Sequence, residues 1–237
     1  MGYAGARVSE DARLALVERF FRGTGESYDA VVAAATLGID RRWKRRLVGM
    51  IPAHASRILD LACGTGISTA AIARRFPLAR VVGVEVRDEY LALARRKMAA
   101  LGLRNVELVL ARAEDYRADA PFDCIASSYL AKYAELPRLV RGAHAMLREG
   151  GAFIAHDFTF PPGRARVALF RLYFFLLQRA GGALLPAWRE IYHGLPRLIE
   201  QTRWLPELQA ALAREGFRDI RAEHLTLYGS AIVRATK

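Results

Sequence analysis

From residue 58 onwards, short apolar runs alternate with longer segments whose apolar residues recur every three or four positions. The short runs predict buried strands, and the longer periodic segments predict amphipathic helices. Alternation of this kind predicts a parallel, doubly wound sheet with right-handed crossovers. We expect strands at 58–62, 80–84, 106–110, 122–127 and 152–157, and helices at 67–76, 89–101 and 136–147.

The segments on either side of this core are patterned differently. Residues 9–21, with Ser9 as the N-cap, predict a first helix, and 28–37 and 40–50 predict two more. A dense apolar and aromatic run at 167–177 and a second helical stretch at 188–202 interrupt the alternation. A last helix at 205–215 precedes strands at 217–225 and 228–235, which we expect to form a hairpin with an antiparallel edge.

These elements together predict an α/β, Rossmann-like, doubly wound sheet of seven strands, parallel except for one antiparallel C-terminal strand. We expect one domain over residues 1–237. It divides into an N-terminal helical cap (1–52), a ligand-binding core (53–159), a helical insertion or lid (160–203), and the final helix and hairpin (204–237).

Composition narrows the class of partner. The chain has 36 lysines and arginines against 24 acids, a net charge of +12, and 53% hydrophobic residues, which argues against disorder. The arginines are spread over several predicted helices with few aromatic residues between them, so nucleic acid is not the favoured partner. A basic face also suits an anionic membrane surface, and peripheral contact with a membrane stays open, as does assembly into a homo-oligomer.

Two cysteines, Cys63 and Cys124, stand without a CxxC motif or a Cys/His cluster. We therefore expect no metal site and a reduced, cytoplasmic protein. No stretch reaches the roughly 18 uncharged apolar residues that a bilayer span needs.

The sequence RILDLACGTG at 57–66 is the strongest chemical signal. A strand ends in Asp60, a turn of small residues follows, and a helix begins after Gly66, which is the geometry that holds a nucleotide-like ligand at a helix N-terminus. Glu85 ends the next strand, 19 residues after Gly66, at a spacing that suits hydrogen bonds from ribose hydroxyls. The third glycine of dinucleotide-binding turns is Thr69 here, which favours a ligand without a pyrophosphate, S-adenosylmethionine, over NAD or FAD.

The chain resembles class I S-adenosylmethionine-dependent methyltransferases, and most closely the UbiE/MenG family of ubiquinone and menaquinone biosynthesis C-methyltransferases. The matching segments include YDAVVAAATLGIDRRWKRRLV, ILDLACGTG, MLREGGAFIAHDFTFPP, LFRLYFFLLQRAGG and LPELQAALAREGFRDI. The resemblance implies S-adenosylmethionine as cofactor and a prenylated quinol as the small-molecule methyl acceptor. The expected cofactor-binding residues are Asp60, Ala62, Cys63, Gly64, Gly66, Glu85, Val86, Ala113, Glu114 and Ser127.

Two segments depart from the family pattern. Ala111-Arg112-Ala113 stands where the family has Gly-Asp-Ala, so Asp115 or the backbone of Ala113 and Glu114 is left to hold the adenine. Residues 130–134 read LAKYA where the family has Gly-Leu-Arg-Asn-Val; Lys132 keeps the cation of the family arginine.

Methylation of a ring carbon needs a group that takes a proton from a ring hydroxyl, or a cation beside that hydroxyl. Candidates at the carboxyl ends of strands, where open α/β sheets bind ligands, are Tyr129, Lys132 and His156. Substrate contacts are expected from Asp157, Tyr28 and Tyr192. Packing is the competing interpretation for Tyr28 and Tyr192, a structural role for His156, and a surface charge for Lys132.

Three alternatives to quinol methylation remain at this stage. A methyltransferase of the same fold could act on another lipid or small metabolite, which the altered 130–134 segment would favour. An RNA methyltransferase is less favoured, and a domain without enzymatic activity is the last. The insertion at 160–203 is either a structural cap or a lid in contact with a membrane.

Overall fold

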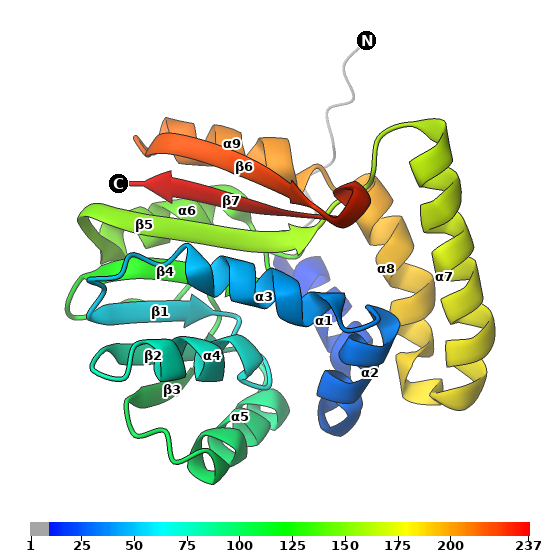
Figure 1. Ribbon diagram of the computed structural model, residues 1–237, viewed down its shortest axis with the longest axis horizontal. Coiled ribbons are helices and arrows are strands. Elements are labelled where there is room, and N and C mark those ends of the chain that lie inside the picture. The colour runs from blue at the N-terminus through cyan, green and yellow to red at the C-terminus, as the bar shows by residue number, and fades with distance from the viewer. Residues whose placement is uncertain (1–9) are drawn as a thin grey trace.

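The computed structural model describes residues 10–237, which fold around one central sheet of seven strands (Figure 1). Across the sheet the strands follow the order β3-β2-β1-β4-β5-β7-β6. The order reverses between β1 and β4, which is where doubly wound sheets bind ligands. The strands are β1 (Arg57–Leu61), β2 (Arg80–Glu85), β3 (Val106–Leu110), β4 (Phe122–Ser128), β5 (Leu147–Phe158), β6 (Arg218–Leu225) and β7 (Ser230–Thr236).

Strands β1 to β5 pair in parallel, and β7 pairs antiparallel with both β5 and β6. The predicted sheet is therefore confirmed, including its single antiparallel strand. That strand is not the edge, however: β7 lies between β5 and β6. The reason is polarity, because β7 (SAIVRAT) is almost entirely buried whereas β6 (RDIRAEHL) carries charges on an exposed strand. Charged side chains are the usual protection of a sheet edge.

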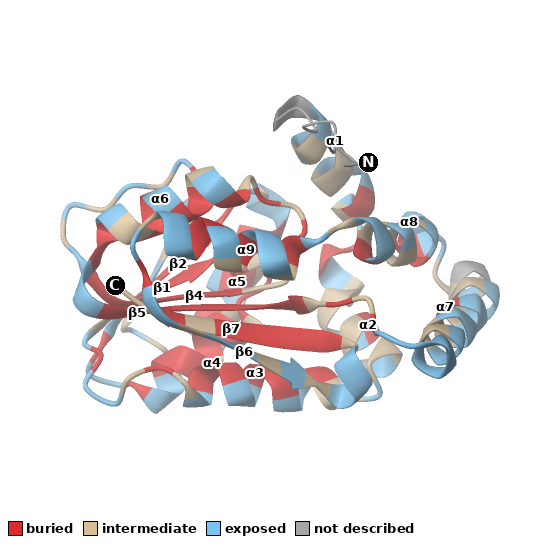
Figure 2. Ribbon diagram, turned by 90° about the horizontal axis from the view of Figure 1, so that it is seen from above, coloured by how far each residue is buried: buried red, intermediate tan, exposed pale blue. Residues whose placement is uncertain are grey.

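Helices cover both faces of the sheet (Figure 2). α3 (Ile39–Gly49) and α4 (Ile67–Arg75) pack on one face, and α6 (Leu136–Met146) and α9 (Trp204–Arg214) on the other. α5 (Asp88–Ala100) packs against β2 and β3.

Successive residues of the central strands enter opposite halves of the core. In β1, Ile58 packs with the α3 and α4 side, whereas Leu59 packs with α6 and α9. Ile154 and Ala155 of β5 divide in the same way. Because a strand turns successive side chains to opposite faces, an apolar run without alternation is buried on both, as the sequence predicts.

The remaining helices lie beyond the carboxyl ends of the parallel strands (Figure 1). They are α1 (Glu10–Phe21) and α2 (Tyr28–Ala35) from the N-terminal segment, and α7 (Arg164–Leu184) and α8 (Arg189–Gln201) from the insertion. A buried cluster of Phe20, Val31, Trp188, Ile191 and Tyr192 joins the two segments. They therefore form one cap over the strand ends. Ser9, the predicted N-cap, lies outside the described residues. Single 3-10 turns are η1 (Gly25–Ser27), η2 (Pro186–Trp188) and η3 (Thr226–Tyr228).

Among residues 10–237, none of the helices has both the length and the apolar character that crossing a bilayer requires.

Candidate active site

The turn between β1 and α4 adopts left-handed backbone conformations at Ala62 (φ 56°), Gly64 (φ 58°) and Gly66 (φ 82°). A Cβ at Gly66 would lie 2.7 Å from the Met98 methyl carbon, so this glycine allows α5 to pack closely against the turn. Ala62 and Gly64 instead line an open cavity. Position 66 therefore requires glycine for two reasons: its backbone φ is positive, and a side chain there would meet α5.

Glu85, at the end of β2, is fastened to this turn. One carboxylate oxygen accepts a hydrogen bond from the Gly64 N–H (3.0 Å), and the other accepts one from the Arg87 N–H (2.9 Å). Burial raises the pKa of Glu85, and the two backbone donors oppose that shift. Each oxygen keeps further acceptor capacity towards the cavity, as a ribose diol would require.

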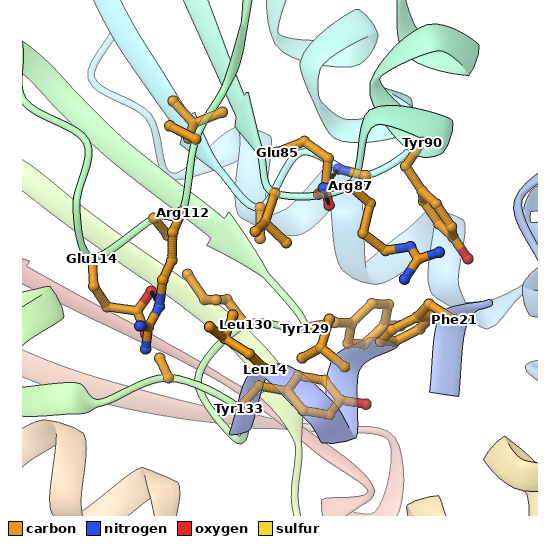
Figure 3. A pocket seen from close by; sticks show the side chains of 18 of the residues that line it. Leu14, Phe21, Glu85, Arg87, Tyr90, Arg112, Glu114, Tyr129, Leu130 and Tyr133 are labelled. Carbon is orange, nitrogen blue, oxygen red and sulfur yellow. Dashed lines mark hydrogen bonds and ion pairs between the residues drawn. The ribbon is translucent and has the colours of Figure 1, made fainter. Parts of the chain in front are cut away.

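The cavity bounded by the turn and Glu85 is called the turn cavity. With its open mouth it measures about 820 Å³. Glu85 and Arg87 lie on one side of it, and Arg112 and Glu114 on the opposite side (Figure 3). Leu14 from α1 also lines it, on the side of Leu130 and Tyr133.

Arg112, which replaces the family aspartate, pairs with its neighbour Glu114 at 3.1 Å. A Glu114 oxygen also accepts a hydrogen bond from the Glu135 backbone N–H (3.1 Å). Asp115 pairs with Arg138 and does not line the turn cavity. Of the two sequence-based hypotheses for the adenine site, the geometry favours the backbone at Ala113 and Glu114 over the Asp115 carboxylate.

α1 is held across the turn cavity by polar contacts at both ends. Arg13 donates hydrogen bonds to the backbone carbonyls of Tyr133 and Ala134. Arg87 forms an ion pair with Glu18. A ligand in the turn cavity would therefore be covered by the N-terminal segment.

A second space, the aromatic chamber, adjoins the turn cavity on the side of the cap. Both spaces are lined by Phe21, Tyr28, Tyr129 and Tyr133. The chamber is completed by Lys132 of the loop after β4 and by residues of α2, α7, η2 and α8, including Trp188 of η2 and Tyr192 of α8. A ligand in the turn cavity and a ligand in the chamber would meet at these four shared aromatic residues, where a group could pass from one to the other.

Tyr129 is the most constrained of these four. Its backbone is left-handed (φ 67°), a conformation that costs energy for a bulky residue. Its ring stacks on Phe158 at 4.7 Å, and its hydroxyl donates to the Asp40 carboxylate at 2.6 Å. Lys44 pairs with the same Asp40 oxygen at 2.5 Å, and its ammonium lies 4.7 Å from the centre of the Tyr129 ring. Burial raises the pKa of Tyr129, with Asp40 adding to the shift, whereas burial lowers the pKa of Lys44.

Lys132 has a comparable anchor in Asp157. Its ammonium lies 2.6 Å from one Asp157 oxygen, and its backbone N–H donates to the other oxygen at 3.1 Å. Burial lowers the pKa of Lys132, and the Asp157 carboxylate opposes that shift. The ammonium also lies 4.5 Å from the centre of the Tyr133 ring. A cation is thereby fixed at the wall of the aromatic chamber.

His156 is placed differently from the prediction. It is fully buried, with Nδ1 2.9 Å from the Ser128 hydroxyl and Nε2 2.6 Å from the Ser230 hydroxyl. Burial lowers its pKa well below the usual range. His156 lines neither space, so the geometry supports a structural role rather than the predicted one as a base.

The other predicted residues divide by the same criterion. Asp157 acts on the chamber only through Lys132, and Ser127 is turned away, so Ser128 lines the turn cavity in its place. Burial raises the pKa of Asp60 to about 7, and its carboxylate accepts a hydrogen bond from Thr69 at 2.6 Å inside the core. Of the predicted residues, those that line the turn cavity are Ala62, Gly64, Glu85, Val86, Ala113, Glu114, Tyr28 and Tyr129. Those that line the chamber are Tyr28, Tyr129, Lys132 and Tyr192. Those that line neither space are Asp60, Cys63, Gly66, Ser127, His156 and Asp157.

Sequence reasoning missed Asp40 and Lys44, which are buried on α3. A signal for them exists: Asp40, Trp43, Lys44 and Leu47 follow the i, i+3, i+4, i+7 spacing of one helix face. Asp40 and Lys44 are opposite charges four residues apart on the apolar face of this helix, a pattern that predicts a buried ion pair and marks both residues as candidates for the site.

The residues present fit S-adenosylmethionine. The Glu85 carboxylate suits a ribose diol, and the aromatic wall suits a sulfonium cation, which is attracted to the faces of aromatic rings. Nothing in this arrangement calls for a phosphate.

Comparisons with known proteins agree with this fit. Residues 58–151 match the family described as "Methyltransferase domain". A demethylmenaquinone methyltransferase from Thermus thermophilus is 32% identical over 207 residues, covering 86% of this chain and 94% of the relative. The ubiquinone/menaquinone biosynthesis C-methyltransferase UbiE from Escherichia fergusonii is 27% identical, covering 97% of this chain and 94% of the relative.

Among solved structures, the pyocyanin biosynthetic protein PhzM superimposes with a TM-score of 0.66 at 16% identity, covering 94% of this chain and 61% of that one, and this likeness concerns the fold alone. The sequence matches go further, because the Thermus thermophilus relative matches over nearly its full length. The chain belongs to the UbiE and demethylmenaquinone methyltransferase family and is an S-adenosylmethionine-dependent methyltransferase.

Proposed function

We propose that this enzyme transfers the methyl group of S-adenosylmethionine to a ring carbon of a prenylated quinol. The observation that carries the proposal is the aromatic chamber, which shares four aromatic residues with the turn cavity and whose wall includes Tyr129 and Lys132, held in place by the buried carboxylates of Asp40 and Asp157. The names of the matched relatives, demethylmenaquinone methyltransferase and UbiE C-methyltransferase, support the same acceptor class.

Bound S-adenosylmethionine supplies an electrophilic methyl group on a sulfonium leaving group. The chain must then make the ring carbon nucleophilic and align it with that methyl group. We assign the first task to Tyr129. Its hydroxyl proton points to Asp40, so the oxygen lone pair is free to accept the proton of a quinol hydroxyl while its own proton passes to Asp40.

Lys132 supports the same step electrostatically. A fixed ammonium at the chamber wall stabilises the quinolate that forms when the hydroxyl proton leaves. Asp157 is a positioning residue, because its two oxygens hold the ammonium and the backbone N–H of Lys132. Tyr28 lines both spaces, and we assign it to alignment of the ring.

The atoms balance without a further reactant. The quinolate ring carbon forms the new C–C bond, and the C–S bond breaks with its electron pair remaining on sulfur. The same ring carbon then loses its hydrogen as a proton and the aromatic ring is restored. The restored ring is a quinolate, which takes back through Tyr129 the proton held by Asp40, so that one proton net is released for each methyl group transferred.

The test is methyl transfer to demethylmenaquinol, kept reduced, with the product analysed by mass spectrometry and NMR. The proposal predicts a new ring-carbon methyl group. It also predicts that Tyr129→Phe and Lys132→Met lower kcat by about 10²-fold or more, the scale of losing acid–base assistance or a fixed charge, without weakening S-adenosylmethionine binding. Arg138→Met, which removes a surface cation, is the matched control. A product methylated on oxygen, or no product, would contradict the proposal.

A second candidate is methylation of another lipid or small phenolic metabolite. It is favoured by the replacement of the family pattern at 130–134. A substrate panel separates the two, since turnover of phenolic metabolites but of no quinol would support the second. Self-assembly, contact with a membrane surface and the predicted cellular location stay predictions.

A further inference from the structure

A third space, the outer groove, continues from the aromatic chamber to the molecular surface. The two spaces share walls formed by Ala35, Thr36, Phe158, Tyr173 and Phe174. With its open side the groove measures about 950 Å³. The turn cavity, the chamber and the groove therefore follow one another in sequence, each adjoining the next through common side chains.

The outer groove is lined mainly by apolar side chains from three segments that are distant in the sequence. Leu37 comes from the turn after α2, Leu169 and Phe170 come from α7, and Leu227 comes from the turn between β6 and β7. Figures 1 and 2 show α7 standing apart from the sheet at the end of the molecule where these segments meet. The hydroxyl of Tyr173 donates to the Ala35 carbonyl at 2.7 Å, which ties α7 to α2 at the junction with the chamber.

Two leucines at the rim of the outer groove are in positions that the fold does not explain. Leu37 is 84% exposed and Leu227 63% exposed, and both have left-handed backbones, with φ 51° and 53°. A side chain with a Cβ is disfavoured there, and Gly or Asn is the usual residue. An exposed apolar side chain kept on an unfavourable backbone indicates a function, because neither packing nor local conformation accounts for it.

We propose that the outer groove binds the isoprenoid tail of the methyl acceptor, which leaves the aromatic chamber between α2 and α7 and reaches the surface between Leu37, Leu169 and Leu227. The proposal rests on the proposed function, since it takes the ring to lie in the chamber. A linear apolar chain matches the groove because it needs no hydrogen-bonding partner, and the groove offers it apolar surface from the chamber wall to the rim.

The backbone at the rim allows a test in which stability and function move in opposite directions. Asn tolerates the left-handed region, so the double variant Leu37→Asn/Leu227→Asn is expected to unfold at the same or a higher denaturant concentration. It also removes apolar contact from the groove. We predict that KM for a quinol with a tail of eight or so isoprene units rises about tenfold or more, on the scale of losing two apolar contacts. For the same ring with one isoprene unit, KM and kcat stay unchanged.

The matched control is Leu172→Asn. Leu172 is on α7 with 54% exposure, close to the 51% of Leu169, yet it lines neither the chamber nor the groove. The control should leave KM unchanged for both tails, in detergent and in vesicles of neutral lipid. If the control and the double variant raised the long-tail KM equally, the tail would be meeting a surface rather than the groove, and the proposal would be overturned. An unchanged long-tail KM in the double variant would overturn it as well.

Binding of geranylgeraniol, an isoprenoid alcohol without a quinol ring, separates this proposal from the proposed function. Trp43 lines the groove and Trp188 lines the chamber, so tryptophan fluorescence reports binding of the isoprenoid, and the double variant assigns that binding to the groove. Saturable binding that the double variant weakens at least fivefold supports the groove, even if the wild-type enzyme methylates no quinol. Absence of saturable binding by the wild-type enzyme overturns it, whatever the turnover.

Discussion

Replacement of Glu85 by Gln tests the assignment of the turn cavity most sharply. The substitution keeps size and shape, but a carboxamide has one acceptor oxygen and one NH₂ group. In the wild type, both carboxylate oxygens accept backbone hydrogen bonds, from Gly64 at 3.0 Å and from Arg87 at 2.9 Å. In Glu85→Gln, one of these N–H groups must face the NH₂ group, and one acceptor for the ribose diol is lost.

The expected loss of binding free energy is about 1–3 kcal/mol, the scale of a hydrogen bond to a charged group. This corresponds to a roughly 5- to 150-fold higher Kd for the cofactor. The loss should be the same for S-adenosylmethionine and for its demethylated product, since both carry the ribose that Glu85 is assigned to bind.

Isothermal titration calorimetry with both ligands provides the measurement, and Glu107→Gln provides the control. Glu107 is a carboxylate on the neighbouring strand β3, paired with Arg80 at the surface and outside the turn cavity. Affinities of Glu85→Gln within twofold of the wild type would refute the assignment. A loss for one ligand only would show that Glu85 senses the methyl group rather than the ribose.

The pH dependence of binding supplies a second readout of the same residue. Burial raises the pKa of Glu85, so the carboxylate is protonated at a higher pH than an exposed glutamate. Protonation removes acceptor capacity that the backbone N–H groups and the ribose use. Cofactor affinity should therefore be full at neutral pH and decline on acidification before an ordinary glutamate would titrate, and Glu85→Gln should abolish this decline.

Three further predictions concern stability. Gly66→Ala should cost about 2–4 kcal/mol in chemical denaturation, because a backbone at φ 82° would carry a Cβ 3.1 Å from the Ala94 Cβ and 2.7 Å from the Met98 methyl carbon. Gly102→Ala, with φ 65° and nothing within 4 Å, should cost about 1–2 kcal/mol. Burial raises the pKa of Asp60 to about 7, so the folded chain binds that proton more tightly than the unfolded chain. The free energy of unfolding gained from this proton is complete below pH ~4 and is lost as the pH rises through 7. Between about pH 5 and 8, the free energy of unfolding of Asp60→Asn should therefore vary less with pH than that of the wild type. Ser230→Ala leaves the buried Nε2 of His156 without its partner and should lower the free energy of unfolding by about 1–3 kcal/mol, with kcat unchanged. A fall in kcat without a loss of stability would instead indicate a catalytic role for His156.

The sequence predicted the sheet well because its central strands β1, β2, β4 and β5 are buried on both faces. A run such as RILDL admits no amphipathic helix, and the glycine turn that follows allows few backbone paths. The position of β7 inside the sheet was harder to predict from the sequence. It depends on which of the two hairpin strands is the more polar, and the pattern of one strand alone does not show this.

The candidate site was predicted where it is local and missed where it depends on long-range contact. Ala62, Gly64 and Glu85 follow from spacing along two neighbouring strands. Asp40, by contrast, meets Tyr129 across 89 positions of sequence. His156 resembles a catalytic residue at a strand end until Ser230, 74 positions later, occupies its second nitrogen. Sequence spacing cannot register such partners, because tertiary packing brings them together.

The central claim is that the turn cavity holds S-adenosylmethionine with its methyl group directed at the aromatic wall shared with the chamber. A crystal structure with the demethylated cofactor product tests it most directly. We predict the ribose hydroxyls on Glu85 and the sulfur facing the rings of Tyr28, Tyr129 and Tyr133. Product bound elsewhere, or bound with its sulfur turned away from these rings, would contradict the account.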